Sequence, residues 1–339
     1  MKHRVLILGA GFWGGRWIEL IRACERTELA GVACDPAAVE AVCGRFGLRG
    51  AAVYPDYREA VERADAEIMV NVLPAALHFD ADRRALERGM HVIAEKPLVA
   101  SMEEAAQLLE IASARPGQRF MASQNYRWRP HNMAIKAALD EGRIGALESI
   151  SLEFRQQEDL QGYRGGLARP LLDDMAIHHF DLLRYFSGAD CAEICARAWR
   201  PSWSLYPGQP NLDAILTMEN GVHVSYTGTW AARGRQSSWD GNLVLTGSEG
   251  CLTLDVENRV YFYPHRKDAS VVLDTACQQG ELLPNAEMAY TEMEYGLRGF
   301  LDCIEEGRVP ETTLADNFKS FSMVDACRRA AEEGYAIRL

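Results

Sequence analysis

The sequence predicts two domains: an α/β domain with a doubly wound parallel sheet over residues 1–123, and an α+β domain with a large, mostly antiparallel open sheet over residues 124–339. Three observations support this. A chain of 339 residues exceeds what one hydrophobic core usually supports. Short apolar runs alternate with amphipathic helical segments through the first domain. Beyond residue 123 the apolar period changes to two, which is typical of an antiparallel sheet with one solvated face.

The first domain shows six strand patterns separated by helical ones. The first is a short apolar run that ends in glycines, which indicates a buried strand at the sheet centre. Pro74 ends the fourth strand, and Ser101 with Glu104 forms a capping box that opens a helix. We expect strands at 4–8, 29–35, near Ala52, 67–73, 91–96 and 119–123, with helices at 13–26, 37–46, 57–64, 75–88 and from Ser101 onward.

The second domain mixes both kinds of element. Period-two alternation predicts one antiparallel sheet over residues 191–264, broken by turn residues. The other expected elements are a helix at 131–141, a strand at 148–156, a glycine-rich loop at 162–166, a helix at 171–186, and closing helices at 287–306 and 315–334.

Charge and cysteine usage restrict the function. A formal net charge of -12 disfavours nucleic acid and anionic membranes as partners, because both need a field of the opposite sign. No apolar run approaches roughly 18 residues, and the start of the chain lacks the features of a signal peptide. The nine cysteines are scattered, which favours reduced cytoplasmic thiols over disulfides or a metal site. We therefore expect a cytoplasmic protein without a metal that acts on small neutral or weakly polar molecules.

Gly9, Gly11 and Gly14 match the G-x-G-x-x-G fingerprint directly after the first strand and at the start of the first helix. The first glycine permits the tight turn, the second lets the backbone approach a pyrophosphate, and the third allows close helix packing. The helix N-terminus offers N–H groups to the phosphates. This context predicts a dinucleotide site in a Rossmann domain rather than an ordinary glycine turn. Phe12 and Trp13 lie between the second and third glycines, and we predict that they also contact the dinucleotide.

Asp35 ends the second strand and follows the glycine motif in the sequence. A carboxylate roughly 20 residues after that motif typically accepts hydrogen bonds from the adenosine ribose hydroxyls. A carboxylate there repels a 2′-phosphate, so we expect NAD rather than NADP, although Arg26 or Arg45 could alter that preference. The alternative is that Asp35 only begins a turn with Pro36.

Lys96 lies at the carboxyl end of the fifth strand, where open α/β sheets place ligand-binding residues. Partly desolvated beside a cationic nicotinamide, a lysine could exchange a proton with a substrate hydroxyl. The alternative is an ordinary solvated lysine at a strand end.

Asp174, His178 and Asp181 are spaced to lie on one face of the predicted helix. Oxidation of an alcohol needs a base that takes the hydroxyl proton, and a histidine oriented by a carboxylate serves near neutral pH. We predict His178 as this base and Asp174 as its partner. His179 lies about 100° further round the helix and cannot share the role. Alone, such an Asp–His pair would more often be an ordinary surface pair.

Taken together, several motifs resemble the Gfo/Idh/MocA family of sugar and polyol dehydrogenases, which includes the inositol dehydrogenases. The resemblance covers nearly the whole chain, and the motifs occur in the family's order. They are GAGFWG at 9–14, NVLPAALH at 71–78, AEKPLV at 94–99, NYRWRP at 125–130 and DMAIHHFD at 174–181, with a closing pattern around Phe300, Pro310 and Ala326.

The resemblance implies a catalytic trio of Lys96, Asp174 and His178. It implies a homodimer or homotetramer built through the open face of the second sheet, and a sugar or polyol as substrate. It also implies that Leu73, Pro74, His78 and Glu95 border the cofactor, and that Tyr126 and Arg127 lie near the nicotinamide or substrate.

The chain departs from the family pattern in the loop before the Asp-bearing helix, where only Gly165 and Gly166 represent a longer glycine-rich run, and at Ala176, which replaces a frequent glycine. The identity of the substrate therefore cannot be inferred from the family. Candidate walls for a sugar ring are Tyr163, Arg164, Trp203 and Trp230, and for each of the aromatic side chains the alternative is ordinary core packing. Two other functions stay open: a glycosidase that uses NAD transiently, and a dinucleotide-binding sugar sensor without turnover.

Overall fold

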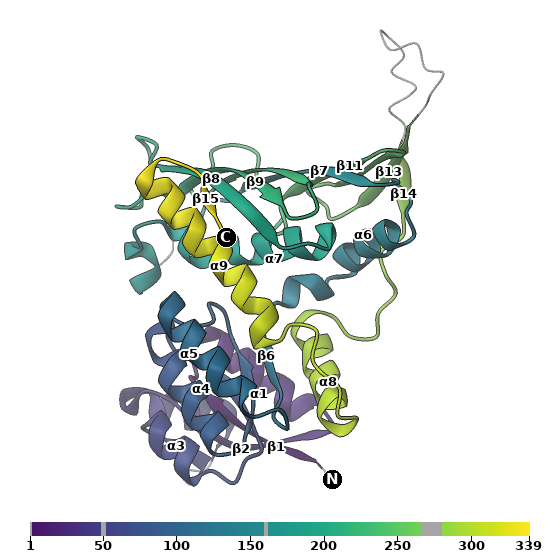
Figure 1. Ribbon diagram of the computed structural model, residues 1–339. Coiled ribbons are helices and arrows are strands. Elements are labelled where there is room, and N and C mark those ends of the chain that lie inside the picture. The colour runs from purple at the N-terminus through teal and green to yellow at the C-terminus, as the bar shows by residue number, and fades with distance from the viewer. Residues whose placement is uncertain (1, 49–51, 159–161, 266–279) are drawn as a thin grey trace. The chain divides into compact units, whose positions relative to one another are not determined.

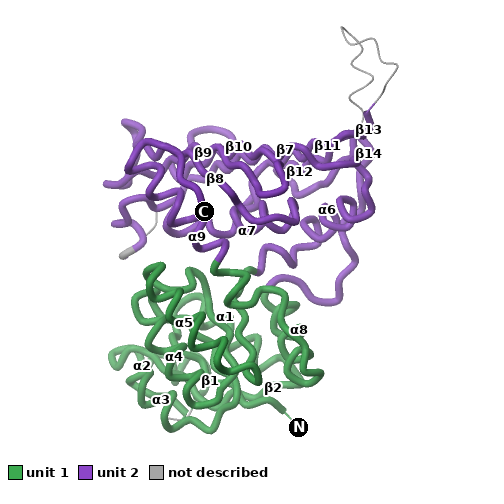
Figure 2. Tube along the Cα trace, in the orientation of Figure 1, with its two compact units in different colours: residues 1–124, 293–318 green, residues 125–292, 319–339 purple. Residues whose placement is uncertain are grey.

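The computed structural model describes residues 2–48, 52–158, 162–265 and 280–339, and for Tyr163 it describes only the backbone. The chain divides into two compact units (Figure 2). Unit 1 comprises Met1–Gln124 and Met293–Phe318, and unit 2 comprises Asn125–Glu292 and Lys319–Leu339. Residues 293–318, which follow the second sheet in sequence, thus fold with the first unit, whereas the sequence pattern assigned them to the second domain.

Unit 1 contains a six-stranded, fully parallel sheet in the order β3-β2-β1-β4-β5-β6. This confirms the predicted doubly wound sheet, with the first strand inside it. The apolar residues of β1 from Val5 to Leu8 are fully buried, as expected for a strand covered on both faces. The strands are β1 (His3–Leu8), β2 (Thr27–Ala33), β3 (Val53–Tyr54), β4 (Ile68–Asn71), β5 (His91–Ala94) and β6 (Phe120–Ala122).

The helices of unit 1 alternate with these strands. Residues 293–318 pack beside them: Arg298 pairs with Glu25 at 2.8 Å, and the hydroxyl of Thr312 donates to the carbonyl oxygen of Ala122 in β6 at 2.7 Å. The helices are α1 (Phe12–Ala23), α2 (Val39–Phe46), α3 (Tyr57–Arg63), α4 (His78–Glu87), α5 (Met102–Ser113) and α8 (Glu292–Glu305). At the start of α5 the Ser101 hydroxyl accepts from the N–H of Glu104, which is one half of the predicted capping box, and the Glu104 carboxylate accepts from the N–H of Ala100.

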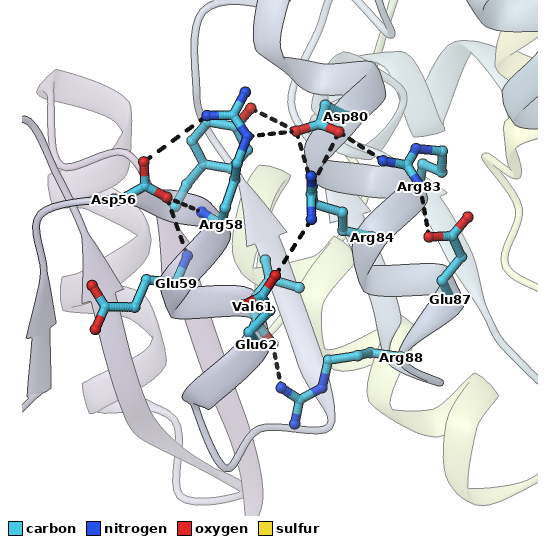
Figure 3. A network of polar contacts seen from close by, with 11 residues as sticks. Asp56, Arg58, Glu59, Val61, Glu62, Asp80, Arg83, Arg84, Glu87 and Arg88 are labelled. Carbon is cyan, nitrogen blue, oxygen red and sulfur yellow. Dashed lines mark hydrogen bonds and ion pairs between the residues drawn. The ribbon is translucent and has the colours of Figure 1, made fainter.

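A polar network joins α3 to α4 on the outside of unit 1 (Figure 3). Asp80 of α4 is its centre and accepts from the Tyr57 hydroxyl at 2.8 Å and from the guanidinium groups of Arg58, Arg83 and Arg84. Burial raises the pKa of Asp80, but hydrogen bonds from Arg83, Tyr57 and Arg84 outweigh it and lower the pKa to about 2. The carboxylate therefore stays ionised and holds the two helices together.

Unit 2 contains a nine-stranded sheet in the order β14-β13-β12-β11-β7-β10-β9-β8-β15. It is mostly antiparallel, as predicted, but β7 and β10 pair in parallel. The parallel pair includes β7, which comes before the segment 191–264 that the sequence predicted to be antiparallel, so the prediction of a mostly antiparallel sheet is confirmed. The strands are β7 (Leu147–Arg155), β8 (Cys191–Trp199), β9 (Asn211–Met218), β10 (His223–Thr229), β11 (Asn242–Gly247), β12 (Gly250–Leu254), β13 (Val260–Pro264), β14 (Glu281–Leu283) and β15 (Ile337–Arg338).

One face of this sheet is covered by helices α6 (Pro130–Asp140), α7 (Ala176–Ser187) and the unit 2 part of α9 (Leu314–Glu333) (Figure 1). Burial alternates along the strands accordingly. In β10, Val224 and Tyr226 are buried, whereas Ser225 and Thr227 are exposed on the opposite face.

The predicted helix over 171–186 is not one continuous α-helix. Leu171–Met175 form a π-helical turn in which the N–H of Ala176 donates to the carbonyl oxygen of Leu171, and the α-helix begins only at Ala176. The 100° spacing used to place Asp174 and His178 on one face therefore does not hold across residue 175. Such π-turns occur frequently at functional sites.

Candidate active site

The turn between β1 and α1 depends on its glycines. Gly9 has φ +98°, and a Cβ there would lie 2.6 Å from the carbonyl oxygen of Val72. A Cβ on Gly14 would lie 2.0 Å from the carbonyl oxygen of Gly9. A Cβ on Gly11 would meet nothing within 4 Å, so open space lies in front of that residue. Gly11 is also the N-cap of α1 and provides no side-chain cap for the first N–H groups. This arrangement fits a pyrophosphate, because a close approach to Gly11 is unobstructed and uncapped donors face it.

Phe12 and Trp13 are exposed at the start of α1, with exposed fractions of 73% and 45%. Their rings meet edge to face at 5.2 Å. Two large aromatic side chains beside the glycine turn lie outside the core of unit 1, and burial therefore does not explain them.

Asp35 follows β2 and is exposed. Its Oδ1 accepts from the N–H of Ala37 at 2.8 Å and thereby caps a short 3₁₀ turn. One of the two carboxylate oxygens of Asp35 therefore stabilises the turn at Pro36, which the sequence analysis gave as the alternative role of this residue. Of the two arginines considered with it, Arg26 pairs with Asp302, and Arg45 lies near Gly15, 3.2 Å from the position of an added Cβ.

His78 links two loops of unit 1. Its side chain is 1% exposed, Nε2 lies 2.7 Å from the carbonyl oxygen of Leu73, and Nδ1 lies 3.2 Å from that of Leu98. Burial lowers the pKa of His78, and a neutral imidazole has a single N–H to donate. The buried ring therefore packs between the loop of Leu73 and Pro74 and the segment that follows Lys96, and it donates a hydrogen bond to one of them.

Glu95 and Lys96 follow β5. The indole N–H of Trp17 donates to Glu95 Oε1 at 2.9 Å, and the backbone N–H of Lys96 approaches Glu95 Oε2 at 3.4 Å. Burial raises the pKa of Glu95 more than the hydrogen bonds from Trp17 and Ser123 lower it. Lys96 is partly buried and precedes Pro97 through a cis peptide bond. The carboxyl end of the fifth strand thus holds a desolvated carboxyl group beside a lysine.

The predicted trio is divided between the units, because Asp174 and His178 belong to unit 2. Asp174 lies in the π-turn, is 9% exposed and forms an ion pair with Arg164. His178 lies in the first turn of α7 and is 5% exposed. Its imidazole stacks on the ring of Tyr126, with centroids 4.3 Å apart and an angle of 8° between the planes.

Arg129 occupies the next position in this stack. Its guanidinium carbon lies 3.5 Å from the centroid of the Tyr126 ring, and its Nη1 forms an ion pair with Asp240 at 2.6 Å. Asp240 is fully buried and also accepts from Asn132 at 2.6 Å. Burial raises the pKa of Asp240, but the charge of Arg129 and hydrogen bonds from His131 and Asn132 lower it to about 2. An ionised, buried carboxylate therefore anchors the arginine that contacts Tyr126.

Sequence reasoning missed this cluster. Arg129 lies within the NYRWRP motif, but Asp240 is 111 residues away in a segment with no motif. No local signal connects them.

Arg127 points into the interior of unit 2. It forms two hydrogen bonds with Asp181, at 2.6 and 2.7 Å, and its exposed fraction is 5%. Asp181 also accepts from the hydroxyl of Ser320. Asp181 therefore binds partners in the interior of unit 2 and does not share a site with Asp174, although their spacing suggested that they lie on one face of the helix.

His179 is fully buried and structural. Its ring nitrogens lie 3.0 Å from the Tyr226 hydroxyl and 3.0 Å from the carbonyl oxygen of Trp239. Burial lowers its pKa to about 4, so the ring is neutral near pH 7. Its two contacts leave it no part in proton transfer, as the sequence analysis expected.

The candidate wall residues lie in different surroundings within unit 2. The side chain of Tyr163 is outside the described residues. Arg164 is engaged by Asp174. Trp203 is 46% exposed and Trp230 is 1% exposed, and both line one cavity. Among the described residues, no helix is long and apolar enough to cross a membrane, and no group of three His, Cys, Asp or Glu side chains could hold a metal ion.

Several curated proteins are similar to this chain. D-apiose dehydrogenase of Paraburkholderia graminis is 26% identical over 350 residues, which cover 100% of this chain and 90% of that protein. Inositol 2-dehydrogenase of Rhizobium meliloti is 30% identical over 204 residues, or 58% of this chain and 59% of that protein. Among solved structures, an Agrobacterium radiobacter oxidoreductase in complex with NAD+, L-tartaric acid and magnesium superposes with a TM-score of 0.86 at 21% identity, covering 100% of this chain and 98% of that one. That likeness shows the fold.

Two family models match the chain. The model described as an oxidoreductase family with an NAD-binding Rossmann fold matches residues 3–123, and the model of the GFO/IDH/MocA C-terminal domain matches residues 132–253. The glycine turn, the two sheets and the relatives agree with both matches. This chain therefore belongs to the Gfo/Idh/MocA family and is an NAD(P)-dependent oxidoreductase of that family.

Proposed function

We propose that the protein is an NAD-dependent dehydrogenase that oxidises a secondary hydroxyl of a sugar, a sugar derivative or a cyclic polyol. The observation that carries this proposal is the setting of His178, a buried imidazole stacked on Tyr126 four residues after the buried carboxylate of Asp174. A histidine whose ring is held in one orientation is suited to accept a hydroxyl proton near neutral pH.

The open space before Gly11 and the uncapped N-terminus of α1 support a bound dinucleotide. When bound, NAD⁺ supplies the acceptor for the hydride that leaves the substrate carbon. We propose that Asp35 binds the adenosine ribose through its second carboxylate oxygen and disfavours NADP. Phe12, Trp13, Leu73, Pro74, His78 and Glu95 border the cofactor in this proposal.

Each catalytic residue has a distinct role in the proposed reaction. His178 accepts the hydroxyl proton, and Asp174 orients His178 and stabilises its protonated form. Lys96 donates a hydrogen bond to the substrate oxygen and relays the hydroxyl proton from that oxygen to His178. Tyr126, Arg127, Tyr163 and Arg164 lie near the substrate in this proposal, and the guanidinium of Arg127 is held by Asp181.

The relatives named D-apiose dehydrogenase and inositol 2-dehydrogenase support a small sugar or polyol as substrate. We also propose a homodimer or homotetramer that forms through the open face of the unit 2 sheet. Ile215 and Val244, with exposed fractions of 64% and 42%, provide apolar surface on that face. The eight described cysteines are thiols, which fits the cytoplasm we expect for the enzyme.

The test is NADH formation, followed by absorbance, over a panel of inositols, aldoses, sugar acids and aryl glycosides. Wild type is compared with Lys96→Ala and His178→Ala, and His223→Ala on the exposed side of β10 is the matched control for the histidine. We expect turnover of one sugar or polyol by wild type and His223→Ala, and its loss in the other two variants while NAD still binds.

Two results would contradict this proposal. Cleavage of a glycoside without net NADH would assign the protein to NAD-using glycosidases. Binding of NAD with no turnover of any compound in the panel would assign it to sugar sensors.

A further inference from the structure

A cavity of about 80 Å³ lies in unit 2 where three segments meet after the ends of β7, β8 and β10. We call it the tryptophan pocket. It is lined by Gln157, Glu158, Trp203, Leu205, Tyr206, Trp230, Ala231, Ala232 and Arg233.

Hydrogen bonds join the three segments, so the pocket is preformed. The indole N–H of Trp203 donates to the carbonyl oxygen of Ala231 at 2.9 Å, and Gln157 forms a β-bridge with the same residue. The hydroxyl of Tyr206 donates to the carbonyl oxygen of Glu158. A site held in this way binds a ligand without first having to order its own loops.

One polar group of the pocket lacks a partner within the described part of the chain. Trp230 is 1% exposed, and its indole N–H has no hydrogen-bond acceptor there. A buried donor without an acceptor is costly, and native proteins rarely leave one so. The missing acceptor points to a ligand or a water molecule.

The charged side chains of the pocket are similarly available. Arg233 is exposed, its guanidinium lies over the Trp203 ring at 5.5 Å, and neither it nor the Glu158 carboxylate forms an ion pair with another described residue. An anionic ligand would face Glu158, and a cationic one would face Arg233. A neutral ligand that both donates and accepts hydrogen bonds satisfies both groups, and adjacent sugar hydroxyls have that chemistry.

Size and exposure indicate how a sugar would fit. A water molecule takes up about 30 Å³ of liquid, so 80 Å³ holds a hydroxymethyl group or two hydroxyls but no whole pyranose. Trp203 is 46% exposed and offers an aromatic edge and face to the rest of a ring. The dimensions therefore suit the hydroxyl-bearing side of a ring that leans on Trp203.

The pocket lies near the proposed base, because Phe154 contacts the Trp230 ring at 5.2 Å and the ring of His179, the neighbour of His178, at 4.7 Å. We propose that the tryptophan pocket is a carbohydrate subsite for a second sugar ring, so that the substrate is a glycoside or disaccharide rather than a free monosaccharide. This inference rests on the proposed dehydrogenase function and narrows its substrate class.

The kinetic test compares substrates that share the oxidised ring: glucose with maltose, and myo-inositol with galactinol. The measured quantity is the ratio of kcat/KM for the two-ring substrate to that for the single ring. We expect Trp203→Ala to lower this ratio at least about tenfold, as loss of a central aromatic anchor does in other interfaces. Trp230→Phe, which removes the N–H together with the five-membered ring of the indole, should lower it about threefold or more. Trp199→Ala is the matched control, because Trp199 is 44% exposed on β8 and outside the pocket.

A binding test distinguishes failure of this inference from failure of the proposed function. Maltose and galactinol are titrated calorimetrically into the NAD-loaded wild type, Trp203→Ala, Arg233→Ala and Trp199→Ala proteins. If no sugar is oxidised but one of these disaccharides binds wild type and Trp199→Ala more tightly than the two pocket variants, the subsite stands and the dehydrogenase function fails. An unchanged kcat/KM ratio together with equal binding by all four proteins would overturn the subsite and leave the pocket to ordered water.

Discussion

The imidazole of His178 lies parallel to the phenol ring of Tyr126, 4.3 Å away and tilted by only 8°. Tyr126 is itself fixed from another side, because Arg129 contacts its ring and Asn132 donates to its carbonyl oxygen at 2.9 Å. The orientation of the proposed base thus depends, through Tyr126, on Arg129 and Asn132, which are not among the proposed substrate contacts.

Replacement of Tyr126 should separate the ring from its hydroxyl. Tyr126→Phe keeps the stacking surface, and we expect kcat within about threefold of wild type. Tyr126→Leu removes the ring, and a misplaced base can cost about a hundredfold in kcat. Steady-state kinetics with a check of NAD binding would measure both. A similar loss in the two variants would show that the hydroxyl, rather than the stack, is what matters.

Replacement of glycine by alanine should have different outcomes at two positions of the glycine turn and at a control position in α2. Gly14→Ala should abolish NAD binding and destabilise unit 1, because the new Cβ would lie 2.0 Å from a carbonyl oxygen. Gly11→Ala meets nothing within 4 Å, so we expect unchanged thermal stability but weaker NAD binding. Gly44→Ala in α2 is the control, and it should be neutral or stabilise by roughly 0.4–1 kcal/mol. Calorimetric titration and thermal unfolding of the three variants test this, and full NAD affinity in Gly11→Ala would remove Gly11 from the cofactor site.

The buried pair of Arg127 and Asp181 should matter for stability. Removal of one partner leaves an uncompensated buried charge, which costs about 3–5 kcal/mol. We therefore expect Arg127→Ala to lower the melting temperature of unit 2 clearly. The pair of Arg259 and Asp255 gives the comparison, because Arg259 is exposed and water screens its charge, so Arg259→Ala should lower the melting temperature much less. Equal shifts in the two variants, measured by scanning calorimetry, would contradict the assigned role.

The Asp80 network predicts a pH dependence. The folded-state pKa of Asp80 is lowered to about 2 from an ordinary value of 3.8, so its stabilisation is present above pH 4 and is lost as the pH falls toward 2. Asp80→Asn should thus be less stable than wild type at pH 7, with a difference that shrinks between pH 4 and pH 2. Urea unfolding over that range measures it. Asp65→Asn, at an exposed side chain, should show little difference at any pH.

Local patterns predicted the six strands of the unit 1 sheet and the extended region of the unit 2 sheet, because their signals lie within a few residues, but they did not predict the short strands β14 and β15. The glycines at 9, 11 and 14 and the apolar run before them determine the β1–α1 turn. Wider relationships were not predictable in this way. The π-turn at Leu171–Met175 has no local signature, and the Arg129–Asp240 pair joins distant segments through tertiary packing.

Hydrophobic periodicity also could not predict that residues 293–318 fold with unit 1. Their amphipathic pattern shows that α8 buries one face, but it does not show which sheet receives that face. The contacts of Arg298 with Glu25 and of Thr312 with Ala122 decide it, and both join residues far apart in the chain.

The path of the chain passes between the units at three places, after Gln124, after Glu292 and after Phe318. A single proteolytic cut at any one crossing leaves the units tethered by the other two. A gene fragment that stops at residue 124 would omit α8 and the turn at Thr312 that forms hydrogen bonds with Ala122 of β6. The cofactor-binding unit is therefore not a detachable N-terminal module, and it can be completed only after synthesis has passed through almost the whole of the second unit.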